Sequence, residues 1–259
     1  MTNEDPIYKI KNVPLFEAIY GKGLISLGGF NAVDKMFDGI SLHKKYLLDI
    51  GFGLGGMAHY LAEKYEATVT GVEIHLWMAQ HAQLTAPERI KDKVSFVTYK
   101  EGSIPISAST IDVAYSKGVL TNVEDKRALF VEVARVLKPS GQICLIDWLV
   151  PEEVGPQTSV LPLGDVSHKE TERSYRTILE SCGFEEIEFQ NKNSEYFDYV
   201  KDLGALLCSD EHKRRFADII PTQLREDIIS SNTKLMQSII NGEQVSTLIH
   251  AKRQSAKFF

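Results

Sequence analysis

The sequence predicts an α/β fold built on a parallel sheet of about seven strands, with the last strand antiparallel, helices on both faces and a helical cap. Two observations carry this prediction. Apolar, β-branched segments alternate with helical periodicity through residues 46–148, which is typical of βαβ units. The first apolar segment runs into Gly51-Phe52-Gly53-Leu54-Gly55-Gly56, and a helical pattern begins at once. Together they indicate a Rossmann-like sheet that binds a ligand at the carboxyl ends of its strands.

The expected elements follow in the order that such a sheet requires. Strands are expected at residues 47–50, 67–74, 94–99, 111–116, 142–148, 184–189 and 245–251. Helices are expected at residues 15–19, 32–37, 58–65, 76–86, 126–137, 171–182 and within 196–241. Lys138-Pro139-Ser140-Gly141 terminates the helix before the fifth strand, since proline and glycine end helices. Recurrent prolines and glycines predict a loop or lid over residues 151–164.

The chain is expected to have three parts. Residues 1–45 form an N-terminal lid segment, of which residues 7–45 are too rich in apolar and aromatic residues for a free tail. It is expected to pack across the mouth of the cleft or, alternatively, on the edge of the sheet. Residues 46–194 and 243–253 form the cofactor-binding core, and residues 195–242 form a helical cap insertion.

The glycine turn and an acid on the next strand are the main candidates for ligand binding. Glycine permits positive φ and leaves room for a ligand to approach the backbone, although a purely structural turn would have the same composition. Glu73 follows about 20 residues later, where an acid meets the ribose hydroxyls in this architecture. A carboxylate can accept hydrogen bonds from both hydroxyls of a ribose. The alternative is a solvated glutamate at a strand end.

Composition excludes several classes of protein. The 259 residues include 29 basic and 35 acidic ones, so no nucleic-acid surface is expected. Three widely spaced cysteines without a CxxC pair predict neither a disulfide framework nor a metal site. No apolar run is long enough to span a membrane, and the polar N-terminus does not resemble a secretory signal. A cytoplasmic monomer or homodimer acting on a small molecule is expected.

The chain resembles class I S-adenosylmethionine-dependent methyltransferases. The resemblance is carried by the glycine turn at residues 49–56, by Gly71-Val72-Glu73, by the Leu-Lys-Pro-x-Gly turn at residues 137–141, and by the order of the strands. It implies that Glu73 holds the ribose of S-adenosylmethionine and that Glu101 meets the adenine. The cofactor-binding residues that it implies are Ile25, Ser26, Asp49, Gly51, Gly53, Glu73, Ile74, Glu101, Gly102 and Ser116.

The N-terminal segment is similar to that of phosphoethanolamine N-methyltransferases. Glu17-Ala18-Ile19-Tyr20-Gly21 and Ile25-Ser26-Leu27-Gly28-Gly29 carry this similarity, which implies that Ile25 and Ser26 meet the cofactor and that Tyr8 latches the site. The partner histidine of that family is replaced by Asn122, and its nearby aspartate by Gly118. The residues that grip phosphate are replaced around Asp165 and Ser167, so the acceptor is expected to differ.

The predicted function is S-adenosylmethionine-dependent methyl transfer to a small-molecule acceptor, with an amine favoured. An amine needs only to be neutral when it attacks, whereas a hydroxyl usually requires a general base, and Asn122 is not one. Tyr8, Asn122 and His168, with Trp148, are the candidate acceptor residues, although each could be structural. The alternatives are O- or C-methylation of a hydroxylated metabolite, a nicotinamide oxidoreductase, and a cofactor-binding module without catalysis.

Overall fold

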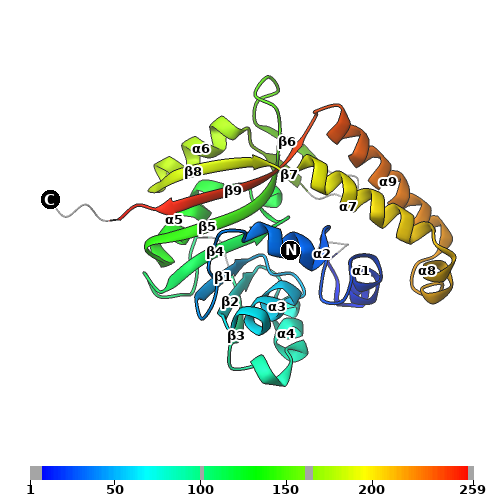
Figure 1. Cartoon of the computed structure of the whole chain (residues 1–259), viewed down its shortest axis with the longest axis horizontal. Coiled ribbons are helices and arrows are strands. Elements are labelled where there is room, and N and C mark those ends of the chain that lie inside the picture. The colour runs from blue at the N-terminus through cyan, green and yellow to red at the C-terminus, as the bar shows by residue number, and fades with distance from the viewer. Residues whose placement is uncertain (1–7, 100–101, 161–165, 256–259) are drawn as a thin grey trace, which may run out of the picture.

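The computed structural model describes residues 8–99, 102–160 and 166–255. Its main sheet consists of seven strands in the order β3-β2-β1-β4-β5-β9-β8 (Figure 1). These strands are β1 (Tyr46–Ile50), β2 (Thr68–Glu73), β3 (Val94–Thr98), β4 (Ile111–Lys117), β5 (Leu137–Leu149), β8 (Phe184–Asn191) and β9 (Val245–Arg253). Strands β1 to β5 pair in parallel, and β9 is antiparallel to both of its neighbours. The predicted fold, including its antiparallel last strand, is confirmed.

Helices cover both faces of this sheet. One face carries α2 (Gly29–Met36), α3 (Gly56–Tyr65) and α4 (Leu76–Thr85), and the other carries α5 (Lys126–Val136) and α6 (Glu172–Ser181). Successive strand residues point to opposite faces. Leu47 therefore belongs to the first apolar core and Leu48 to the second, and both are fully buried. Burial on both faces explains why the strands have nearly continuous apolar sequences.

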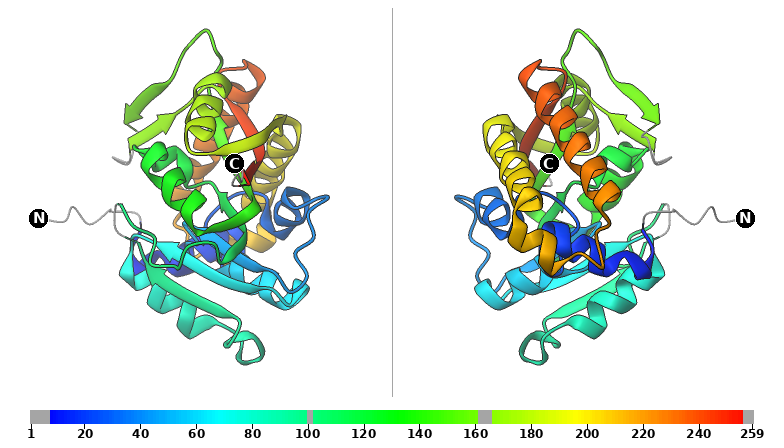
Figure 2. Two further views of the ribbon diagram at one scale, coloured as in Figure 1. Left: turned by 90° about the vertical axis from the view of Figure 1, so that its left-hand side faces the viewer. Right: turned by 90° about the vertical axis from the view of Figure 1, so that its right-hand side faces the viewer.

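The predicted helical cap consists of α7 (Asn193–Cys208), α8 (Asp210–Arg215) and α9 (Thr222–Ile240). Figure 2 shows α7 and α9 side by side, with α1 (Val13–Tyr20) at the end of this pair. An apolar cluster joins α1 to the cap, and its buried members are Ala18, Ile19, Leu203, Leu207 and Ile220. The N-terminal segment therefore packs against the cap, a long-range contact that no local pattern predicts.

Two segments differ from the predicted structure. A hairpin of β6 (Gln157–Val160) and β7 (Val166–Lys169) occupies the end of the predicted loop and projects from the body in Figure 2. Polar residues in both of its strands conceal the alternation that would have predicted it. Strand β5 begins at Leu137, five residues before the prediction, because Leu137 already pairs with Ile111 before the register shifts.

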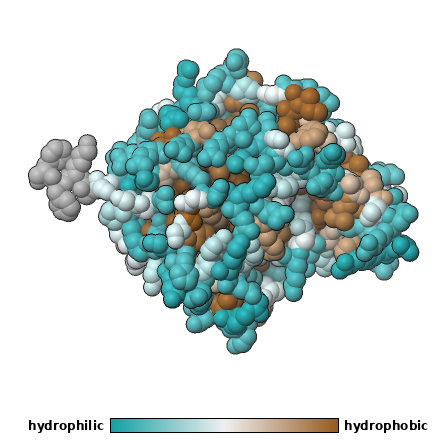
Figure 3. All heavy atoms as spheres, viewed as in Figure 1, coloured by the Kyte–Doolittle hydropathy of each residue, from teal (hydrophilic) through white to brown (hydrophobic). Residues whose placement is uncertain are grey.

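The surface shown in Figure 3 is mostly hydrophilic, with apolar atoms in separate groups. Among the most exposed apolar side chains are Leu84 on α4, which is 83% exposed, and Ile240 on α9, which is 63% exposed. These residues lie on different elements. Within the described residues, no helix is both long enough and apolar enough to cross a membrane.

Candidate cofactor-binding site

The glycine turn connects β1 to α3 and has an unusual backbone. Gly51, Gly53 and Gly55 have φ angles of +73°, +57° and +84°, which side chains disfavour. A Cβ on Gly53 would lie 2.6 Å from Ile25 Cδ1, and one on Gly51 would lie 2.4 Å from Val119 Cγ2. The absence of side chains therefore lets two other segments lie directly on the turn.

The N-terminal segment is fastened to this turn. Gly56 N donates a hydrogen bond to Gly23 O over 3.1 Å, and a Cβ on Gly56 would lie 2.4 Å from that same oxygen. Ile25 packs on Gly53 from the same segment. Gly23 and Ile25 of the N-terminal segment therefore contact the glycine turn directly.

Glu73 lies at the end of β2, beside the glycine turn. Gly51 N donates a 2.8 Å hydrogen bond to Val72 O, so the turn and the acid belong to adjoining strands. The Glu73 side chain is 10% exposed, and its Oε1 accepts hydrogen bonds from Ile74 N at 2.8 Å and from His75 Nδ1 at 3.2 Å. This arrangement fixes the carboxylate at the carboxyl edge of the sheet.

Asp49, in β1, is buried behind the turn. Its Oδ2 accepts a 2.9 Å hydrogen bond from the Tyr115 hydroxyl. Burial raises the pKa of Asp49 to about 7; the charge of Glu73 adds to this effect, while the Tyr115 hydrogen bond and the charge of Lys117 oppose it. A carboxyl group in this state is half ionised near neutral pH.

Sequence reasoning missed Lys117, the last residue of β4. Its side chain is buried, and Nζ donates hydrogen bonds to Ser26 Oγ at 2.6 Å and to Leu27 O at 2.7 Å. Burial lowers the pKa of Lys117 to about 8, against the opposing charge of Asp49. The sequence did contain a signal for this residue: a lysine stands at the carboxyl end of an apolar strand, where ligands of such sheets bind.

Asp49 and Lys117 suit the amino-acid end of S-adenosylmethionine. That end carries an ammonium and a carboxylate, and the structure supplies one buried acid and one buried base beside the glycine turn. Charge-assisted hydrogen bonds of this kind are stronger than neutral ones. The charges of Asp49 and Lys117 therefore fit the amino-acid end of this cofactor, and the Glu73 carboxylate offers acceptors that would suit ribose hydroxyls.

The other implied cofactor residues have different surroundings. Ser116 is fully buried, and its hydroxyl donates to Ile50 O over 2.8 Å, so this side chain joins β4 to β1. Ile74 is 67% exposed beside Glu73, and Gly102 has a φ of +95° in an exposed turn. Glu101 lies outside the described residues, as does Asp165.

The candidate acceptor residues fall into two groups. Tyr8 lies beside His75: its ring centroid is 5.8 Å from that of His75, and its carbonyl accepts a 3.0 Å hydrogen bond from Trp77 Nε1. Asn122 is exposed at the end of a short 3₁₀ helix, η3 (Leu120–Asn122), that follows β4. His168 is on β7, which packs against η3, and its Nδ1 lies 3.2 Å from Thr158 Oγ1.

Buried polar contacts hold these acceptor-side elements in place. Thr121 donates a hydrogen bond to Asp147, and the same carboxylate accepts one from Trp148 N at 2.9 Å. Lys126 Nζ donates to His168 O over 2.6 Å, which ties the hairpin to the start of α5. Asn122 and His168 therefore lie on the neighbouring elements η3 and β7, which these hydrogen bonds hold at the carboxyl end of the sheet.

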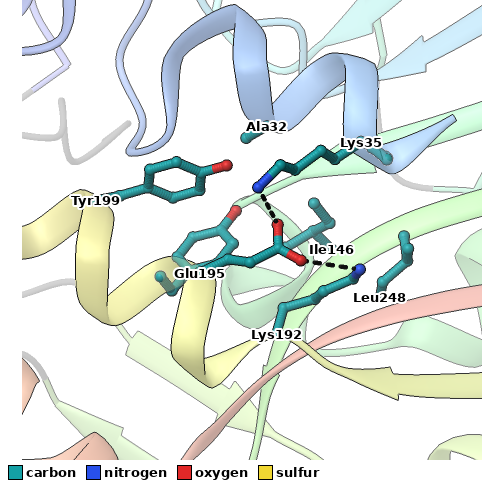
Figure 4. Close-up of a pocket in the computed structure, with 9 residues that line it drawn as sticks. Ala32, Lys35, Ile146, Lys192, Glu195, Tyr199 and Leu248 are labelled. Atoms are coloured by element: carbon teal, nitrogen blue, oxygen red, sulfur yellow. Dashed lines mark hydrogen bonds and ion pairs between the residues drawn. The ribbon is translucent and has the colours of Figure 1, made fainter. Parts of the chain in front are cut away.

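Two cavities lie away from the glycine turn. One lies between α2 and α7, where Lys35 and Lys192 both pair with Glu195 beside Tyr199 (Figure 4). Its volume of about 10 Å³ suits a single water molecule. The other, of about 250 Å³, is lined by Lys45, Asp112 and Lys138 near the amino-terminal ends of the strands. Among the described residues, no three potential metal ligands come together.

The comparisons with known proteins agree with this geometry. Residues 48–145 match a family described as "Methyltransferase domain". These residues contain the glycine turn, Glu73 and strands β2 to β4. Residues 48–145 thus contain a methyltransferase domain, and the chain as a whole has the fold of a solved methyltransferase that binds S-adenosylhomocysteine.

Two curated relatives are named as N-methyltransferases. The chain is 28% identical over 250 residues to phosphoethanolamine N-methyltransferase 3 of Arabidopsis thaliana, covering 95% of this chain and 50% of the relative. It is 27% identical over 150 residues to sarcosine/dimethylglycine N-methyltransferase of Halorhodospira halochloris, covering 56% of this chain and 53% of that one. The chain thus spans about half the length of these curated relatives.

A solved structure has a similar fold. Phosphoethanolamine N-methyltransferase 2 of Haemonchus contortus, in complex with phosphomonomethylethanolamine and S-adenosylhomocysteine, superposes with a TM-score of 0.81. The two are 20% identical, and the match covers 96% of this chain and 58% of that one. The similarity therefore includes the cap and the N-terminal segment as well as the sheet.

Proposed function

We propose that this protein transfers a methyl group from S-adenosylmethionine to the nitrogen of a small-molecule amine. The observation that carries the proposal is the convergence of the bare glycine turn, the Glu73 carboxylate and the buried pair Asp49 and Lys117 at one edge of the sheet. Each group complements a different part of one adenosyl ligand. A plain structural turn would require neither buried charge.

The cofactor supplies an activated methyl group on a sulfonium, which leaves little covalent chemistry for the protein. The residues of the chain instead bind and orient the two reactants and exclude water. Holding reactants in line can lower a barrier by about 7–11 kcal/mol. In this proposal, residues 46–194 and 243–253 hold the cofactor, while residues 1–45 and the cap at 195–242 enclose the acceptor.

The amine acceptor is supported by the residues on the acceptor side. Asn122 has an amide, which does not serve as a general base, and a neutral amine does not need one. The curated relatives named above are N-methyltransferases. Tyr8, Asn122 and His168, with Trp148, are proposed to face the acceptor. Of Asn122, His168 and Trp148, His168 has the side chain that could act as a general base. O-methylation with His168 as the base is therefore the competing proposal.

The test combines cofactor binding with a transfer assay. Calorimetry with S-adenosylhomocysteine should give saturable 1:1 binding, whereas NAD should give none. The protein is then incubated with S-adenosylmethionine and panels of amines, phenols and carboxylic acids, and products are identified by mass spectrometry. Methylated amines would support the proposal. Methylation of phenols or acids alone would contradict the amine, and binding without any transfer would support an inactive module.

The buried pair predicts how cofactor affinity depends on pH. Below pH 7, Asp49 becomes protonated and loses its attraction for the cofactor ammonium, because its pKa is raised to about 7. Above pH 8, Lys117 loses its charge and its attraction for the cofactor carboxylate, because its pKa is lowered to about 8. Affinity should therefore peak between these values and fall about tenfold for each pH unit beyond them.

Calorimetry with S-adenosylhomocysteine from pH 5.5 to 9.5 measures this profile. Lys117→Met should weaken binding at pH 7.5. Above pH 8 the affinity of this variant should fall only because the ligand's own amino group loses its proton. Asp49→Asn should abolish the acidic limb. Thermal unfolding at each pH shows whether the variants are folded. A wild-type profile that stays level from pH 6 to 9 would contradict the assignment of both residues.

We also propose a cytoplasmic location and a monomeric or homodimeric state. The cysteines Cys144, Cys182 and Cys208 all have free thiols, which fits a reducing compartment. Sedimentation of the purified protein would measure the oligomeric state directly.

A further inference from the structure

His75 lies between the acid of the proposed ribose site and the N-terminal segment. On one side, its Nδ1 is 3.2 Å from Glu73 Oε1. On the other side, its ring packs against Tyr8, with 5.8 Å between the centroids and an interplanar angle of 48°. The side chain is 25% exposed, so these contacts are partly shielded from water.

Tyr8 links this contact to the rest of the N-terminal segment. Its ring is 6.1 Å from that of Phe16, which is buried on α1. Its carbonyl accepts the hydrogen bond from Trp77 Nε1 at the start of α4. Tyr8 therefore contacts both His75 and Trp77, which follow β2 closely in the sequence.

We propose that His75 is a positioning residue that orients the Glu73 carboxylate toward the cofactor ribose and couples cofactor binding to the docking of the N-terminal segment through its contact with Tyr8. This inference rests on the proposed cofactor site. Among the described residues, Ile74 N and His75 Nδ1 are the hydrogen-bond donors to the Glu73 carboxylate, and both act on Oε1. The orientation of Oε2 is thus set by these two contacts.

The coupling has a simple physical origin. A ribose bound to Glu73 restrains the carboxylate, which restrains the imidazole ring through its hydrogen bond. A restrained ring presents a fixed surface to Tyr8, and an ordered Tyr8 in turn favours the docked segment. By linkage, whatever docks the segment also strengthens cofactor binding by the same factor. Ring packing and one charge-assisted hydrogen bond are each contacts of modest strength.

Two substitutions separate the two contacts of His75. In His75→Asn the side-chain amide can still donate to Glu73 from near the Nδ1 position, but it has no ring to meet Tyr8. In His75→Phe a ring still meets Tyr8, but nothing donates to Glu73. His81→Asn is the matched control, because His81 also lies on this side of α4 and contacts Trp77, with 6.4 Å between centroids.

Each variant is studied by calorimetry with S-adenosylhomocysteine and by hydrogen exchange of residues 9–20, with and without saturating ligand. In the wild type and in His81→Asn, the ligand should slow exchange of this segment. In His75→Phe the dissociation constant should rise about 2- to 10-fold, and the ligand should no longer protect the segment, because the ring has lost its hydrogen bond to Glu73. In His75→Asn the dissociation constant should rise less than in His75→Phe, and the ligand should again fail to protect the segment, because no ring meets Tyr8.

The outcomes distinguish this inference from the proposed function. If the wild type does not bind S-adenosylhomocysteine, the proposed function itself fails. If the wild type binds, and the ligand protects residues 9–20 in His75→Asn as fully as in the wild type, the coupling does not run through His75. Equal losses of binding in both variants, with equally lowered melting temperatures, would give His75 a purely structural role and would also overturn the inference.

Discussion

Glu73→Ala should weaken S-adenosylhomocysteine binding about 10- to 150-fold, equivalent to about 1.5–3 kcal/mol for hydrogen bonds to a charged group. The reason is that the proposed ribose contact uses a carboxylate that is 10% exposed and held at the end of β2 by Ile74 N and His75. A ligand hydroxyl left facing alanine would lose this acceptor. Calorimetry at pH 7.5 measures the change directly.

A conservative variant and a control variant test whether the loss comes from the Glu73 carboxylate. Glu73→Gln keeps the length of the side chain and one acceptor oxygen, so its loss should be smaller than that of alanine. Glu88→Ala removes a glutamate whose side chain is 86% exposed and paired with Lys91, and its dissociation constant should match the wild type. An unchanged affinity in Glu73→Ala would rule out the ribose contact.

The parts of the molecule that sequence reasoning predicted are those specified by local patterns. The glycine turn and Glu73 belong to adjoining strands of one βαβ unit, and the turn hydrogen-bonds to the residue before Glu73, Gly51 N to Val72 O. Apolar strands with two buried faces and helices with clear stops, such as α5 and α6, were predicted for the same reason. Local chemistry is sufficient for such elements.

The features that were missed depend on contacts between distant segments. In the sequence, Lys117 looks like the polar, exposed end of a strand. In the structure, its ammonium is buried against Ser26 Oγ and Leu27 O of the N-terminal segment. The β6–β7 hairpin is stabilised by its base, where buried Lys126 donates to His168 O across 42 positions of the chain. Neither contact has a periodicity or a motif, because each is set by tertiary packing.

The structure gives Ser116 a role in joining strands, and its implied ligand contact stays a prediction. A family pattern places this serine at the carboxyl end of β4, but the side chain alternation of the strand turns its hydroxyl toward Ile50 O. The next residue, Lys117, then faces the N-terminal segment. The pleat of β4 therefore turns the side chains of Ser116 and Lys117 toward opposite faces of the sheet.

The junction between cap and N-terminal segment leads to the second large prediction. His212 is 5% exposed, and its Nε2 is 2.8 Å from Ala18 O on α1. Its Nδ1 is 2.8 Å from an Arg225 guanidinium nitrogen, which also donates to Leu207 O over 2.9 Å. Arginine only donates hydrogen bonds, so Nδ1 is the acceptor and Nε2–H donates to Ala18 O.

His212→Leu should therefore lower the free energy of unfolding by about 2–4 kcal/mol. Leucine cannot accept from Arg225, which is itself 5% exposed, and a buried charge that loses a partner is strongly destabilising. The link to Ala18 is lost as well, so the N-terminal segment should loosen. Urea denaturation followed by circular dichroism measures the change, with His43→Leu, an exposed histidine, expected to shift stability by less than about 0.5 kcal/mol.

The double variant His212→Leu/Arg225→Leu decides the cause. If the penalty comes from a buried guanidinium without its acceptor, removing that guanidinium should recover part of the loss, and the double variant should be less destabilised than the sum of the single ones. Additive losses would mean that the two side chains act independently. A loss below about 0.5 kcal/mol in His212→Leu would show that the junction is solvated and that the cap and α1 are joined by their apolar contacts alone.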